Sequence, residues 1–172
     1  RFVLPHAPCQ PVTMNQGFEM RAWYDLYDLS LEKDDDERGM ERSSTFIDKL
    51  IEEQILLGIK PEKIIVGGFS QGAAMSFYLG LKHPKRLGGI AALSGYLPLK
   101  ERLLESLNND LIDIPIFMGH GLYDNVIDIK IANSSFEKLS NKLNAVDFEK
   151  YDMGHELCEK EIDDLSIFFN QS

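Results

Sequence analysis

The chain has 172 residues, of which 44% are hydrophobic and 27% charged, a composition typical of a globular domain and not of a disordered or fibrous chain. Its 18 Lys and Arg residues against 28 Asp and Glu residues give a net charge of −10, which argues against nucleic-acid or membrane-surface binding through bulk charge. No apolar run approaches the roughly 18 residues of a membrane span, so we expect no stable membrane insertion.

The chain contains two cysteines, Cys9 and Cys158. They are too few for a disulfide framework and too far apart in sequence for a zinc-ribbon pattern. We therefore expect a reduced, cytoplasmic compartment and no metal site.

The first part of the chain is irregular. Residues 2–4 resemble a strand that arrives at a loop, and the three prolines between residues 5 and 11 argue against a regular element there. Apolar side chains between residues 14 and 24 would line a groove or belong to the core, and the sequence leaves both open. The acidic run at 34–37 is typical of a helix N-terminus and not of a metal site. A strand so close to the first residue suggests that the natural polypeptide begins earlier.

Short apolar strands and amphipathic helices alternate through the rest of the chain. The patterns predict strands at 63–67, 89–93, 114–118 and 146–151, and helices at 39–57, 71–82, 99–107, 129–143 and 158–169. Strands separated by helices form parallel βαβ units. We therefore expect one α/β domain over residues 1–172, with a mostly parallel sheet and helices on both of its faces.

The strongest chemical signal is the pentapeptide Gly68-Phe69-Ser70-Gln71-Gly72. It matches G-x-S-x-G between a predicted strand and a predicted helix, which is the context of the nucleophile turn of α/β-hydrolases. The glycines leave room for a tight turn that lifts the Ser70 hydroxyl above the sheet, and the helix N-terminus directs backbone N–H groups at an oxyanion. The alternative is a plain glycine-rich turn in which the serine caps the helix.

A serine nucleophile needs a base, and the chain order Ser, acid, His is typical of this fold. His120 and His155 both follow predicted strands, at the sheet edge where Ser70 lies. The order selects Asp124 as the acid and His155 as the base. His120 precedes its acid, so we expect it to fix the Asp124 loop, and we expect Asp128 to begin the following helix.

Several motifs resemble the acyl-protein thioesterase and small carboxylesterase family of α/β-hydrolases over almost the whole chain. They are Phe2–Pro8, Pro11–Thr13, Met20–Asp25, Gly67–Gly72, Leu93–Leu99, His120–Asp124 and Gly154-His155. The resemblance implies a cofactor-free serine hydrolase of carboxylic esters or acyl thioesters, with small acyl esters or acylated proteins as substrates. Several esterases of this kind form dimers, so the oligomeric state stays open between monomer and homodimer.

The resemblance also implies roles for individual residues. Ser70 is the nucleophile, Asp124 the acid and His155 the base, and the backbone N–H of Gln71 is one oxyanion donor. The same resemblance places further side chains near an acyl-chain groove: Leu29, Tyr96 and Val126.

The sequence departs from the family pattern in two respects. Asn125 stands where members usually carry a proline, which loosens the loop without removing a catalytic atom. Members also begin with further strands and a His-Gly-rich loop that supplies a second oxyanion N–H, and this sequence contains neither. We therefore expect an α/β-hydrolase fold that lacks its N-terminal strands. A hydrolase-like binding module without turnover is the competing hypothesis, and a peptidase on the same fold is a weaker one.

Overall fold

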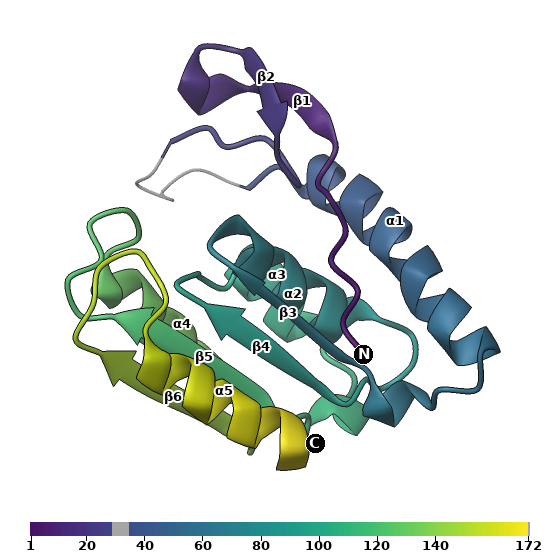
Figure 1. The fold of residues 1–172 in the computed structure, drawn as a ribbon. Coiled ribbons are helices and arrows are strands. Elements are labelled where there is room, and N and C mark those ends of the chain that lie inside the picture. Colours follow the sequence, from purple (N-terminus) through teal and green to yellow (C-terminus); the bar gives the residue numbers. More distant parts are fainter. Residues whose placement is uncertain (29–34, 172) are drawn as a thin grey trace.

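The computed structural model describes residues 1–28 and 35–171 (Figure 1). Its main sheet has four parallel strands in the order β3-β4-β5-β6, which are Ile65–Phe69, Gly89–Leu93, Ile116–Gly121 and Val146–Tyr151. The α-helices of the described ranges are α1 (Glu37–Leu56), α2 (Gln71–Lys82), α3 (Lys100–Glu105), α4 (Ile129–Ser140) and α5 (Glu159–Gln171). The expected alternation of strands and helices in a parallel sheet is confirmed.

Side chains of successive strand residues pack on opposite faces of this sheet. Ile90 and Ala92 belong to the larger core, which α1, α2 and α4 cover, whereas Ala91 and Leu93 pack with Phe168 of α5. This alternation follows from the period of two along a strand. Figure 1 shows α5 lying across β5 and β6 in front of the sheet, with α2 and α4 behind it. Helices therefore cover both faces, as expected from the sequence.

The N-terminal part contains an element that the sequence analysis missed. Strands β1 (Cys9–Val12) and β2 (Phe18–Arg21) form an antiparallel hairpin (Figure 1). Pro11 lies opposite Glu19 in its register. The prolines do not prevent it, because a proline that lacks an N–H is tolerated where a strand has a neighbour on one side only. The strand expected at residues 2–4 does not form.

The apolar residues of this region divide between the core and the surface. Tyr24 is completely buried, whereas Phe18 is 72% exposed and Met20 43% exposed on the hairpin. The acidic run lies at a helix N-terminus, as expected: Asp36 caps α1 by accepting a hydrogen bond from the Gly39 amide at 2.9 Å.

Across the described ranges, no helix is long and apolar enough to cross a membrane.

A buried carboxyl group lies between α5 and the sheet. Glu161 of α5 is completely buried and contacts Gly119 of β5, where a Cβ atom would overlap Glu161 Oε1. Neither carboxyl oxygen has a hydrogen-bond partner within residues 1–28 and 35–171. Desolvation raises the pKa of Glu161 from 4.5 to about 7.

This raised pKa predicts that the protein loses stability as pH rises from about 4.5 to about 7. In that window the unfolded state releases the Glu161 proton while the folded state retains it. Glu161→Gln removes the titration. The free energy of unfolding of the variant, relative to wild type, should therefore increase across the window by up to about 3 kcal/mol, as measured by urea denaturation. A difference that does not change with pH would contradict the assignment.

Candidate active site

The G-x-S-x-G turn joins β3 to α2 with a single residue between them. Ser70 has φ 57° and ψ −119°, a conformation that side chains rarely adopt and that marks a strained turn. A Cβ atom on Gly68 would overlap the backbone of Gly72, but one on Gly72 would meet only the Trp23 indole nitrogen at 4.0 Å. The expectation that both glycines leave room for the turn is therefore correct for Gly68 and wrong for Gly72.

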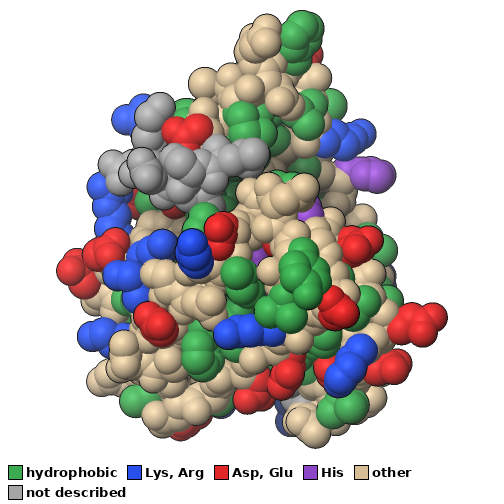
Figure 2. Space-filling model, turned by 90° about the vertical axis from the view of Figure 1, so that its left-hand side faces the viewer, with side chains coloured by type: hydrophobic (Ala, Val, Ile, Leu, Met, Phe, Trp, Pro, Cys, Tyr) green, Lys and Arg blue, Asp and Glu red, His purple; other side chains and the backbone are tan. Residues whose placement is uncertain are grey.

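The structure brings Ser70, His155 and Asp124 together. His155 Nε2 lies 3.0 Å from Ser70 Oγ, and His155 Nδ1 lies 2.7 Å from Asp124 Oδ2. The three residues come from the β3–α2 turn and from the segments that follow β5 and β6. Because the strands are parallel, the segments that follow them all lie at the carboxyl-terminal edge of the sheet. Figure 2 shows that edge, with small recessed areas of imidazole near its centre and hydrophobic side chains beside them.

The Asp124 carboxylate is fully buried but has several donors. Oδ1 accepts hydrogen bonds from the Val126 and Ile127 amides, each at 2.8 Å, and Oδ2 faces His155. Burial alone would raise the pKa of Asp124, but the hydrogen bonds from His155 and the two amides outweigh it and lower the pKa. The carboxylate therefore stays ionised beside the imidazole. Asn125, at the position where a proline is usual, leaves these bonds in place.

A second imidazole lies against the same carboxylate. His120 is the fifth residue of β5, and its Nε2 lies 2.8 Å from the Ile127 carbonyl oxygen and 3.4 Å from Asp124 Oδ2. Burial lowers the pKa of His120, so a neutral ring donates from Nε2 to the Ile127 carbonyl. The expectation that His120 fixes the Asp124 loop is confirmed, although it lies in the strand and not after it. Asp128 caps α4, also as expected.

The side chains expected near an acyl-chain groove are placed differently from one another. Tyr96 is 3% exposed, and its hydroxyl donates to Asp35 at 2.7 Å and accepts from the Tyr24 hydroxyl at 2.9 Å. Val126 is half-buried and packs against the larger core. Leu29 lies outside the described residues. Contact of these three side chains with an acyl chain stays a prediction.

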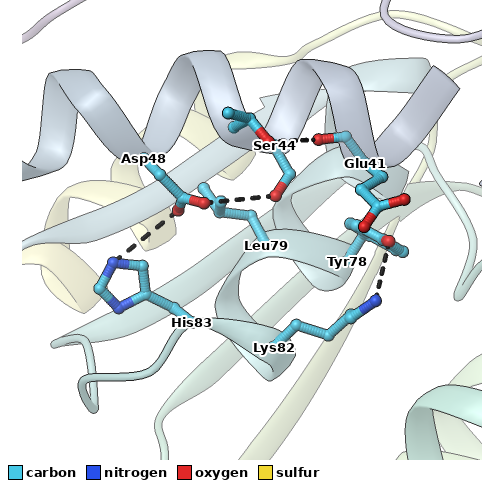
Figure 3. Close-up of a pocket in the computed structure, with 8 residues that line it drawn as sticks. Glu41, Ser44, Asp48, Tyr78, Leu79, Lys82 and His83 are labelled. Carbon is cyan, nitrogen blue, oxygen red and sulfur yellow. Dashed lines mark hydrogen bonds and ion pairs between the residues drawn. The ribbon is translucent and has the colours of Figure 1, made fainter. Parts of the chain in front are cut away.

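A pocket of about 200 Å³ lies between α1 and α2, away from these residues (Figure 3). The His83 ring points toward Asp48, with 3.8 Å between Nε2 and Oδ1, and the Lys82 ammonium donates to the Tyr78 hydroxyl at 2.8 Å. These residues lie at the end of α2 opposite Ser70, so the pocket is not the site of the Ser-His-Asp cluster. No group of three or more potential metal ligands occurs within the described ranges.

The contacts of one side chain in the site could not be found from the sequence. The Gln71 side chain binds the backbone of Trp23 and Tyr24, which lie 48 and 47 residues earlier. Such a long-range amide contact leaves no local pattern.

The sequence matches the Phospholipase/Carboxylesterase family over residues 1–172. It is 39% identical to acyl-protein thioesterase 1 of Schizosaccharomyces pombe over 83% of this chain and 64% of that protein. It is 35% identical to acyl-protein thioesterase 1 of Cryptococcus neoformans over 100% of this chain and 79% of that protein. Its fold is similar to the crystal structure of Arabidopsis thaliana SOBER1, with a TM-score of 0.91 and 27% identity over 98% of this chain and 82% of that one.

The chain therefore belongs to the Phospholipase/Carboxylesterase family and has the α/β-hydrolase fold. Its resemblance to acyl-protein thioesterases, first visible in the sequence motifs, is confirmed. Within the family the chain is a serine hydrolase of the acyl-protein thioesterase type.

The turn geometry predicts unequal effects for its two glycines. Gly68→Ala should lower the thermal midpoint by several degrees, because the added methyl overlaps the Gly72 backbone. Gly72→Ala, the matched control, should leave the midpoint within about 2 °C of wild type because it has space. Thermal unfolding followed by circular dichroism checks both variants, and equal losses would contradict the steric account.

Proposed function

We propose that Ser70, His155 and Asp124 form a catalytic triad that hydrolyses acyl thioesters or carboxylic esters through an acyl-enzyme. The observation that supports this most directly is the continuous path of polar contacts, 3.0 Å from Ser70 to His155 and 2.7 Å from His155 to Asp124. Both distances are within the reach required for proton transfer and for orientation of the base.

The proposed reaction has two halves. Ser70 Oγ bonds to the acyl carbonyl carbon while its proton moves to His155 Nε2, and Asp124 keeps the other proton on Nδ1 and stabilises the imidazolium. The tetrahedral intermediate breaks its bond to the leaving thiol or alcohol, which takes the proton from Nε2. Water then attacks the carbonyl carbon of the acyl–Ser70 ester and gives a proton to His155 Nε2. This second tetrahedral intermediate breaks its bond to Ser70 Oγ, which takes the proton back from Nε2, and the carboxylic acid is released. The Gln71 backbone N–H, at the start of α2, stabilises the oxyanion in both halves.

We further propose acylated proteins as the substrate class, with small acyl esters as accessible alternatives. The names of the curated relatives, acyl-protein thioesterase 1, support this choice. We also propose a cytoplasmic location, which the free thiols of Cys9 and Cys158 support because disulfides are rare in that compartment. Homodimer formation stays a prediction.

Ser70→Ala should abolish hydrolysis of a p-nitrophenyl acyl ester and of an S-palmitoylated peptide, with a loss on the order of 10⁶ in kcat. The variant should also lose covalent labelling by a fluorophosphonate. Ser76→Ala is the matched control, because Ser76 lies on α2, the helix that follows Ser70, and its hydroxyl bonds to the Gly72 carbonyl, and this variant should remain active.

Three outcomes of this experiment would contradict the proposal in different ways. Near wild-type rates in Ser70→Ala would exclude Ser70 as the nucleophile. A wild-type protein that resists the fluorophosphonate would favour the non-catalytic binding module. Turnover of the small ester without turnover of the palmitoylated peptide would remove acylated proteins from the substrate class.

A further inference from the structure

The side-chain amide of Gln71 links the residue after Ser70 to a distant part of the backbone. Its Oε1 accepts a hydrogen bond from the Trp23 N–H at 2.8 Å, and its Nε2 donates to the Tyr24 carbonyl oxygen at 2.8 Å. One planar group thus binds two consecutive residues of the same segment. Two such bonds fix the orientation of the amide as well as its position.

The segment that Gln71 binds is itself held from two other directions. The Ser43 hydroxyl of α1, which is buried, donates to the Trp23 carbonyl oxygen. The Tyr24 side chain is completely buried, and its hydroxyl donates to Tyr96 at 2.9 Å. Gln71 is therefore bonded to a rigid support and not to a loose loop.

This support bears on the oxyanion. The Gln71 N–H opens α2, where the first amides have no acceptor within the helix and point outward from its N-terminus. The residue before it, Ser70, has a strained backbone with φ 57°. A strained turn keeps its geometry only where surrounding contacts impose it. The Gln71 side chain supplies two such contacts at the adjacent residue.

We propose that the Gln71 side chain is a positioning residue, which holds the backbone N–H of the same residue in the orientation that stabilises the oxyanion. The inference rests on the function proposed above. The positioning role requires a side chain at residue 71 that has one donor and one acceptor in a fixed plane. Methionine has similar length but neither group, and an ionised glutamate has only acceptors, one of which would face the Tyr24 carbonyl oxygen.

The first test compares Gln71→Met and Gln71→Glu with wild type at pH 7.5. Each variant should lower kcat for a p-nitrophenyl ester by about 10- to 100-fold, with KM within about twofold, because the lost contribution acts on the transition state. Gln10→Met is the matched control. Gln10 Nε2 donates to the Ala22 carbonyl oxygen at 2.6 Å, next to the Gln71 contacts but away from the turn, so kcat should not change.

The second test uses pH to restore the missing donor. The carboxyl group introduced by Gln71→Glu gains an O–H when it is protonated, and it can then donate to the Tyr24 carbonyl oxygen while still accepting from Trp23. The ratio of the kcat of this variant to that of wild type should therefore rise several-fold from pH 7.5 to pH 5. The corresponding ratio for Gln71→Met should stay flat.

The two tests also separate failure of this inference from failure of the proposed function. The inference is wrong if Gln71→Met keeps kcat within twofold of wild type, or if Gln10→Met loses as much as the Gln71 variants. If Gln71→Met does not fold, a flat pH ratio for folded Gln71→Glu overturns it. In each case wild-type labelling by a fluorophosphonate that depends on Ser70 would leave the triad proposal intact, whereas absence of that labelling would reject the triad itself.

Discussion

The buried negative charge of Asp124 is the constraint on which the geometry of the site depends. A carboxylate with no exposed side-chain area is costly unless donors surround it, and here two backbone amides and the His155 imidazole donate to it, while the His120 ring packs 3.4 Å from Oδ2. The amides come from the same turn, His120 from β5, and His155 from the segment after β6. Removing any one donor would leave part of the charge uncompensated. The carboxylate therefore fixes the position of the His155 ring, whose other nitrogen faces the Ser70 hydroxyl.

The sheet brings the two segments together before their side chains interact. The backbone pairing of β5 with β6 continues past the strands, because the Leu122 amide donates to the Tyr151 carbonyl oxygen at 2.9 Å and the Tyr123 amide to that of Met153 at 3.0 Å. A Cβ atom on Gly121 would overlap the carbonyl oxygens of Met153 and Gly154. The close approach of the two segments therefore requires a glycine at position 121. The register of β5 and β6 thus brings the segments of Asp124 and His155 together, and the hydrogen bond between the two side chains then sets their orientation.

The sequence predicted the features that rest on local pattern or on chain order. A short apolar run located the strand at 89–93 and period-two alternation located the strand at 146–151, both as observed, and the order Ser, acid, His selected the three residues that converge. The sequence-based prediction was wrong where residues that are not typical of strands take part in one, and where the deciding contacts are distant in sequence. The predicted strand 114–118 begins instead at Ile116 and reaches Gly121, because Pro115 lacks the N–H for the ladder and the Gly-His-Gly run does not read as a strand.

Spatial arrangement, which local sequence patterns do not report, also explains other features that the sequence analysis missed. The β1–β2 hairpin forms despite Pro11, because pairing with one neighbour does not need its missing N–H. The hydrogen bonds of the Tyr96 hydroxyl to Tyr24 and Asp35 could not be predicted either, because neither partner is adjacent to Tyr96 in sequence. The clearance around Gly72, unlike that around Gly68, depends on where Trp23 lies in space.

The central claim, that Asp124 orients His155 toward Ser70, is tested most directly by measuring which ring nitrogen of His155 carries the proton in the resting protein. ¹⁵N NMR of histidine-labelled protein at pH 8, with His155→Gln to assign the signals, reports which nitrogen carries the proton. If the Asp124 carboxylate orients the base, the proton lies on Nδ1 and the unprotonated Nε2 faces the Ser70 hydroxyl. A proton found on Nε2 would leave no acceptor for that hydroxyl and would contradict the proposed triad.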